Sequence, residues 1–81
     1  MIGPFRLSSN ELRNQIPTNI FSATRVTVTS PVEGSFELHV GNSPARLCTF
    51  GAGVSSFENH FGGMYLSVKN KSSCVISVTA E

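Results

Sequence analysis

Residue types that can do chemistry gather in one stretch of the chain, SSFENHFGGMYLSVKN, which covers residues 55–70. Glu58 lies two residues before His60, and several serines are near, so a hydrolytic histidine–serine pair can be drawn. The sequence has no G-x-S-x-G elbow to expose a nucleophile, and it contains no aspartate, the commonest third member of a serine–histidine triad. We therefore predict that the protein has no catalytic residues and is not an enzyme.

A metal site is the second chemical option. His39 and His60 could share a metal with Glu37 or Glu58, and Glu37 and His39 would point to the same face of a strand because they are two residues apart. Zinc sites usually contain closely paired cysteines or histidines, which this sequence lacks. We expect a solvent-facing pair of side chains here, with no metal and no cofactor.

The two cysteines, Cys48 and Cys74, allow two interpretations. In a secreted protein a bridge between them would stabilise a small fold. The N-terminal sequence MIGPFRLSSNELRNQ has no basic segment followed by an apolar one, as a secretory signal would. We therefore favour synthesis in the cytoplasm and two buried free thiols. The N-x-S match at Asn70 matters only on a secretory route.

Glycines help to define the local structure around the chemical candidates. Gly51 and Gly53 lack the third glycine of a phosphate-binding loop, since Ser56 stands in that position. Aromatic rings recur every fourth residue at Phe57, Phe61 and Tyr65, as on a helix, but the glycine pair 62–63 interrupts that spacing, and each glycine costs about 1 kcal/mol inside a helix. We predict a loop leading into a strand, whose aromatic rings cover the open end of the core or anchor a partner; we favour the first.

Apolar and polar residues alternate, with a period of two, in the segments that must position these candidate residues. Alternation predicts strands in five segments, and a sixth if residues 53–58 pair. The five segments are residues 21–30, 35–40, 45–50, 64–69 and 74–80. We expect the first two to form one hairpin, the last two to form another, and Leu47 to face inward in the third. The short turns and the lack of helical periodicity predict an all-β fold, a small antiparallel β-sandwich or jelly-roll-like barrel of five to six short strands.

The N-terminal residues follow a different pattern. Ser8 lies three residues before Glu11, as in a helix capping box, and Pro17 would end a helix soon afterwards. We predict an arm or a helix of one to two turns in residues 1–20, and a β-sandwich domain in residues 21–81.

Composition excludes several partners. The 81 residues carry a net charge of +1 with only 14% charged residues, so the chain offers no basic surface for nucleic acid or anionic membranes. Its apolar runs are far shorter than the roughly 20 residues that cross a bilayer. A domain of this size has a thin core and often depends on disulfides, metals or oligomerisation.

A short β-rich chain with a nearly neutral Ser/Thr/Asn surface is similar in composition and layout to small accessory proteins of virus particles. These are in particular phage capsid decoration or cement proteins and head-fibre or spike modules, which are often β-sandwich homotrimers. The resemblance implies a non-enzymatic, virion-associated assembly protein that docks on a larger assembly such as a capsid. From the small core and the low-charge surface we predict a homo-oligomer and favour a trimer. The predicted contact residues are Phe5, Leu12, Ile16, Phe57, Asn59, His60, Phe61 and Tyr65.

A small carbohydrate- or ligand-binding β-sandwich module is the alternative function. In that case Phe57, Phe61 and Tyr65 would stack on the ligand, while Asn59 and His60 would form hydrogen bonds to it. The chain has no tryptophan, the residue that most often stacks on sugars.

Overall fold

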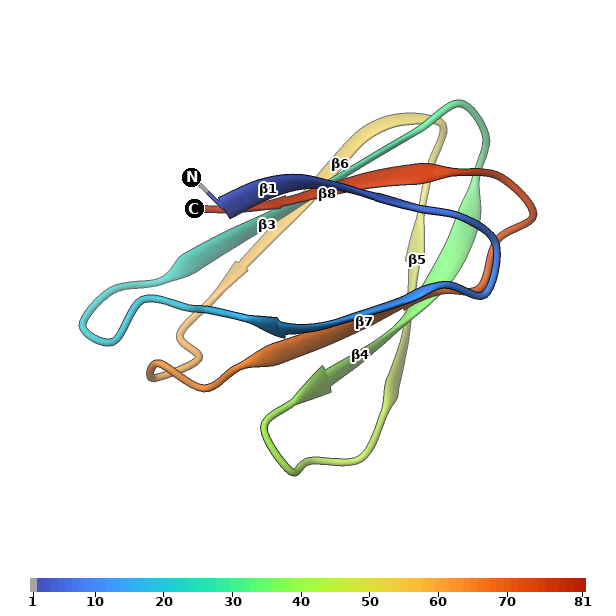
Figure 1. The fold of residues 1–81 in the computed structure, drawn as a ribbon. Helices are drawn as coiled ribbons and strands as arrows, with labels where there is room; N and C mark the ends of the chain where they lie inside the picture. The colour runs from blue at the N-terminus through green and yellow to red at the C-terminus, as the bar shows by residue number, and fades with distance from the viewer. Residues whose placement is uncertain (1) are drawn as a thin grey trace.

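Two antiparallel sheets of four strands each pack face to face in the computed structural model, which describes residues 2–81 (Figure 1). The strand order is β1-β8-β3-β6 in one sheet and β2-β7-β4-β5 in the other. The strands are β1 (Ile2–Leu7), β2 (Leu12–Ile16), β3 (Thr24–Ser30), β4 (Gly34–Val40), β5 (Arg46–Phe50), β6 (Gly53–Asn59), β7 (Leu66–Asn70) and β8 (Ile76–Ala80).

The connections between strands define the topology. Within residues 2–81, only β4 and β5 are consecutive strands that pair with each other; every other connection passes from one sheet to the other. Eight antiparallel strands arranged in this order form a double-sheet jelly roll. The predicted all-β sandwich class is confirmed, with eight strands in place of five to six.

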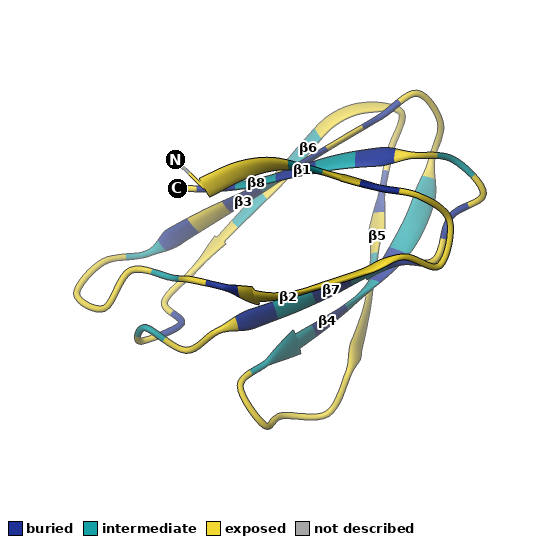
Figure 2. Ribbon diagram, in the orientation of Figure 1, coloured by how far each residue is buried: buried dark blue, intermediate teal, exposed yellow. Residues whose placement is uncertain are grey.

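The core lies between the sheets and consists of the inward side chains of alternating residues (Figure 2). Val26 and Val28 of β3 and Ile76 and Val78 of β8 are buried, as their period-two pattern predicts. The ring of Phe36 stacks between those of Phe50 and Phe57, with centroids 6.2 and 6.1 Å away. The other fully buried apolar residues are Leu7, Ile16, Leu38, Phe61, Leu66, Val68 and Ala80.

The predicted N-terminal helix is wrong, because β1 and β2 occupy this part of the chain and form one edge strand of each sheet. Residues 2–81 contain no helix, and Met1 lies outside the described residues. The capping-box residues do interact, but in a turn: the backbone N–H of Ser8 donates to Glu11 Oε1 at 2.8 Å, and the N–H of Glu11 donates to the Ser8 oxygen at 3.0 Å. In a capping box the serine hydroxyl would accept the glutamate N–H, whereas here the backbone oxygen of Ser8 accepts it, as in a β-turn.

Both predicted hairpins are also wrong. β3 pairs with β6 and β8, while β4 lies in the other sheet and pairs with β5 and β7. β7 and β8 are likewise in different sheets. Alternation identifies the buried face of a strand, but the same pattern arises whether the next strand pairs with it or crosses to the opposite sheet.

The inward face of β5 is the opposite of the predicted one. Leu47 is 69% exposed on the outer face, whereas Phe50 is buried. The register with β4 places Arg46 opposite Leu38 and Cys48 opposite Phe36, so both lie on the inward face of β5, where Cys48 is half-buried and Arg46 is exposed. The stacking of Phe50 on Phe36 fixes this register.

Residues 2–81 contain no helical segment of the length and apolarity that crossing a membrane requires.

Candidate functional site

The residues considered for catalysis have other partners in the structure. Glu58 forms an ion pair with Arg25 on the outer face of β3 and β6, with Nη2 at 2.8 Å and Nε at 3.2 Å from the same carboxylate oxygen. The hydrogen bond and the charge of Glu58 raise the pKa of Arg25 above its ordinary value. The His60 backbone N–H donates to Asn59 Oδ1 at 2.9 Å. Glu58 therefore serves a surface ion pair.

The metal candidates are divided between the sheets. His39 lies on β4 opposite Ser67, while Glu37 is 3.4 Å from the Lys71 ammonium group. His60 follows β6 in the other sheet. Among residues 2–81, no three His, Cys or Glu side chains gather in a group that could hold a metal ion.

Three connections meet at one end of the sandwich, and we call residues 17–23, 41–45 and 60–65 the loop end (Figure 1). Thr18 Oγ1 donates to the Met64 oxygen at 2.7 Å, and the Gly63 N–H donates to the Asn19 oxygen at 3.2 Å. The Gly41 N–H donates to the Tyr65 oxygen at 2.9 Å. These bonds hold the three loops together as one surface.

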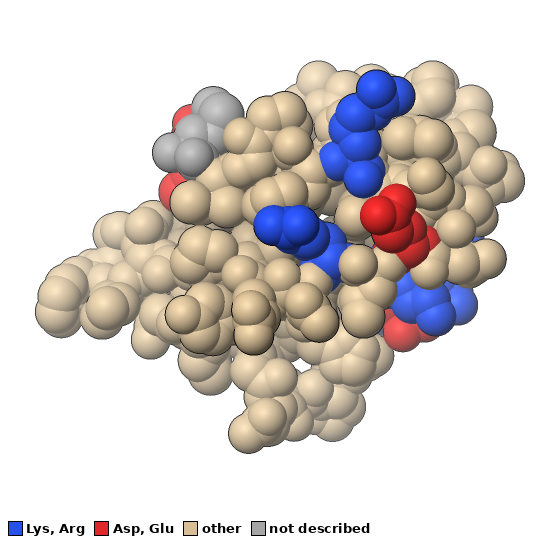
Figure 3. Space-filling model, viewed as in Figure 1, with Lys and Arg blue, Asp and Glu red and all other residues tan. Residues whose placement is uncertain are grey.

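The loop end is apolar and uncharged. Its three segments contain no Lys, Arg, Asp or Glu. Figure 3 shows the acidic and basic side chains of the facing surface mainly over the rest of the sandwich. Four large apolar side chains are exposed there: Ile20 by 65%, Phe21 by 97%, Met64 by 48% and Tyr65 by 60%. Exposed apolar groups and few charges characterise the centre of protein interfaces.

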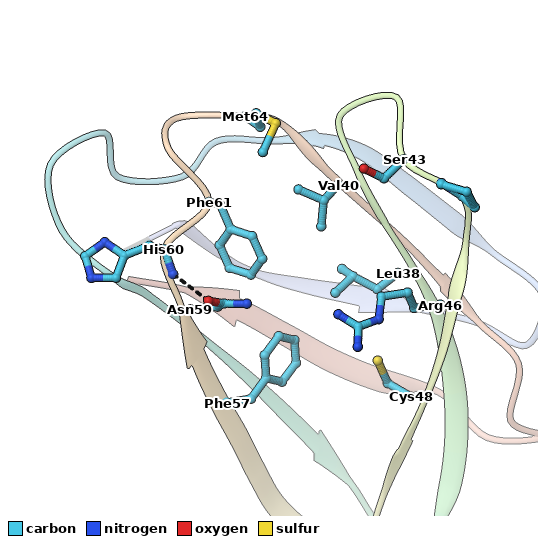
Figure 4. Close-up of a pocket in the computed structure, with 11 residues that line it drawn as sticks. Leu38, Val40, Ser43, Arg46, Cys48, Phe57, Asn59, His60, Phe61 and Met64 are labelled. Atoms are coloured by element: carbon cyan, nitrogen blue, oxygen red, sulfur yellow. Dashed lines mark hydrogen bonds between the residues drawn. The ribbon is translucent and has the colours of Figure 1, made fainter.

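A pocket of about 410 Å³ lies beside the loop end, between β4 and β5 on one side and β6 with its following loop on the other (Figure 4). Most of its wall is apolar, from Leu38, Val40, Phe57, Phe61 and Met64. The remaining lining residues are Ser43, Pro44, Arg46, Cys48, Asn59 and His60. β5 and β6 are edge strands, so no neighbouring strand covers this side of the sandwich.

The two cysteines are free. Cys48 faces the pocket from β5, and Cys74 lies in the connection between β7 and β8. Both are half-buried, so they are less enclosed than the predicted buried thiols.

The predicted contact residues are spread over different environments. Ile16 and Phe61 are buried in the core, so a partner docking on this structure would not touch them. Phe5 is half-buried, with the Arg13 guanidinium 4.2 Å above its ring, and Leu12 is 52% exposed on β2. Asn59 and His60 are exposed beside the pocket, Phe57 is half-buried within it, and Tyr65 belongs to the loop end. The aromatic residues therefore do not form one exposed platform for a sugar.

The predicted contact residues did not include Ile20, Phe21 or Arg46. Phe21 was placed at the start of a predicted strand, but it lies in a loop. A usable signal was available: the segment PTNIFSA, residues 17–23, combines two large apolar residues with no charge. The alternation of residues 45–50 fits either face, and the predicted inward position of Leu47 left Arg46 on the outer face.

The strand order and the two surface features define a small jelly-roll protein with an apolar loop end and an open side pocket. Residues 5–81 match the family described as "Family of unknown function (DUF8244)", and the chain belongs to that family. No curated protein and no solved structure matches it.

Proposed function

We propose that this protein is a non-enzymatic assembly protein that oligomerises through its loop end and docks on a larger protein body. The exposure of Phe21 carries the proposal, since 97% of this residue is in contact with solvent. Burying a Phe side chain contributes roughly 1.5–3 kcal/mol, and Ile20, Met64 and Tyr65 extend the same surface. A cluster of exposed large apolar side chains that includes aromatic rings resembles the anchor groups that dominate interface energies.

The kind of assembly is inferred by analogy. Double-sheet jelly rolls occur in viral capsid and lectin domains, and a fold of this type hosts several functions. The low charge and small size of the chain favour a virion component, either a capsid decoration or cement protein or a head-fibre or spike module. We propose that it is virion-associated, without contacts to nucleic acid or membrane.

A homotrimer is the oligomer we favour. The chain exposes 4843 Å² of surface, and a standard interface buries about 800 Å² on each partner. The exposed apolar residues lie together at one end of the sandwich, so a rotation axis near that end would bring the Phe21 rings of three copies together in a closed ring. Such contacts would add to a thin core.

The test measures mass in solution and binding to a particle. Sedimentation of the wild-type protein should give three times 8.7 kDa at micromolar concentration, and Phe21→Ser with Tyr65→Ser should give the monomer. Leu47→Ser and Val54→Ser are matched controls, because these residues are 69% and 72% exposed but lie on the sheets. A wild-type protein that stays monomeric at high micromolar concentration, and does not copurify with a particle, would overturn the proposal.

A further inference from the structure

Arg46 lies on the inward face of β5 but is exposed, because β5 is an edge strand on the open side of the sandwich. It lies directly opposite Leu38, which is only 4% exposed, and residues that face each other across an antiparallel pair project to the same side. The next two residues on this face of β5 are Cys48 and the buried Phe50. A guanidinium group therefore continues a row of otherwise apolar side chains.

No acidic group of the protein neutralises Arg46 within residues 2–81. The ion pairs of this part of the chain join Arg25 to Glu58 and Lys71 to Glu37. None of the hydrogen bonds among residues 2–81 has the Arg46 side chain as its donor. The pocket that Arg46 lines contains no Asp or Glu. A guanidinium is charged at every physiological pH and offers five N–H donors, which suit a carboxylate in a bidentate geometry.

A second donor lies across the pocket. Asn59 Oδ1 accepts the His60 backbone N–H at 2.9 Å, which directs the Asn59 amino group away from that bond. Figure 4 shows this amino group and the Arg46 guanidinium pointing into the pocket from β6 and β5, respectively, while the His60 imidazole points away from the pocket. The polar part of the pocket thus presents donors to a ligand.

The remaining walls are apolar. Leu38 and Val40 come from β4, Phe57 comes from β6, and Phe61 and Met64 come from the loop that follows it. The volume of about 410 Å³ falls within the roughly 300–1,000 Å³ of ligand pockets. A phosphate would need more than one cation to balance its charge, whereas a single arginine matches the one negative charge of a carboxylate.

We propose that this pocket binds a small amphipathic carboxylate, with its head group on Arg46 and Asn59 and its apolar body against Leu38, Phe57 and Met64. The pocket shares residues with the loop end, but the exposed Ile20, Phe21 and Tyr65 do not line it. The shared residues are Ser43, Pro44, His60, Phe61 and Met64. Binding of the ligand and assembly of the protein can therefore be tested independently.

Decanoate is the probe, and decanol is the matched neutral molecule. Titration monitored by amide NMR should show saturable one-to-one binding of decanoate, with shifts confined to β4, β5, β6 and the residue 60–65 loop. Decanol should bind about tenfold more weakly, because it cannot form the charge-assisted hydrogen bonds. Arg46→Gln should weaken decanoate binding about tenfold without changing decanol binding.

Arg6→Gln is the control variant, since Arg6 lies on the edge strand β1 at the other side of the sheets and should not affect either probe. Arg46→Lys keeps the charge but loses the planar fork, and should give an intermediate affinity. This second variant also serves if Arg46→Gln does not fold. The proposal would be overturned if decanoate showed no saturable binding, or if decanoate and decanol bound equally well.

The cysteines supply an independent readout. Cys48 lines the pocket and Cys74 does not, and both are half-buried. Decanoate should slow the reaction of Cys48 with iodoacetamide in the wild-type protein and leave the reaction of Cys74 unchanged, as measured by peptide mass spectrometry. Equal protection of both thiols, or protection of neither, would contradict the assigned site.

Discussion

The side-chain amide of Asn70 on β7 donates a hydrogen bond of 2.9 Å to the backbone oxygen of Leu7 on β1, and so joins the two sheets inside the protein. Its second N–H donates to the Cys74 oxygen at 2.7 Å. Its oxygen accepts from the N–H and the hydroxyl of Ser72, at 2.9 and 2.6 Å. Asn70 is completely buried, and every hydrogen-bonding position of its amide is occupied.

This network gives the N-x-S match at residues 70–72 a structural role. The amide nitrogen to which a glycan would be attached is buried and makes two hydrogen bonds within the protein. A glycan cannot be accommodated there in the folded chain. The spacing instead lets the Asn70 oxygen accept the N–H two residues later, as in an Asx turn.

Replacement of Asn70 should strongly destabilise the fold. Asn70→Ala leaves the Leu7 oxygen and the Ser72 N–H without this partner, and each buried unsatisfied group costs about 1–3 kcal/mol. The Cys74 oxygen keeps the Ser72 hydroxyl as a donor at 3.1 Å. We expect a loss of at least about 2 kcal/mol in the free energy of unfolding, measured by urea denaturation. Asn14→Ala, at an exposed position of β2, is the control. A loss below about 1 kcal/mol would show that water replaces the network.

Gly63 should be required for the contact between two loops of the loop end. Its φ is +80°, and a Cβ at this position would lie 2.8 Å from Ile20 Cγ1. Gly63→Ala should therefore lower stability through both backbone strain, about 1–2 kcal/mol, and the clash. Combining it with Ile20→Ala should remove the clash and leave the strain. Thermal unfolding of the two single variants and the double variant measures this coupling; strictly additive effects would contradict it.

The Arg13 guanidinium and the Phe5 ring should stabilise each other where the edge strands of the two sheets meet. The guanidinium carbon lies 4.2 Å from the ring centroid, and Arg13 is exposed. A double-mutant cycle with Arg13→Gln and Phe5→Leu should give a coupling energy of about 0.5–1 kcal/mol, the range of exposed cation–π pairs. A coupling energy of zero would mean that the Phe5 ring contributes to stability through burial alone.

The sequence predicts the buried faces of several strands but not their neighbours. Val26, Phe36 and Val78 are buried where alternation places them. The pairing was mispredicted because crossing to the other sheet leaves the alternation unchanged. After β7, for example, the Asn70 network ties the chain to the Cys74 and Leu7 oxygens, and β8 continues in the opposite sheet.

The first two strands could not be found from periodicity because their backbones are irregular. The register of β1 shifts between Ile2 and Phe5, and that of β2 shifts between Arg13 and Ile16. Gln15 has a φ of 56°, which few residues adopt within a strand. The position of Arg46 in the pocket could not be predicted for a related reason. An arginine lies on the inward face only where an edge strand leaves the interior open, and the sequence does not show that β5 is an edge strand.

Association through the loop end should depend little on salt and should weaken on cooling. The three segments of this surface carry no Lys, Arg, Asp or Glu, so they contain no charges for ions to screen. Burial of Phe21 and its neighbours is driven by the hydrophobic effect, which weakens as the temperature falls. Sedimentation equilibrium at low and high sodium chloride should give association constants within about twofold of each other, and a smaller constant in the cold. An association constant that falls about tenfold with added salt would instead place the contact on a charged surface, such as the outer face of β7 and β4, where Lys69 lies opposite Glu37.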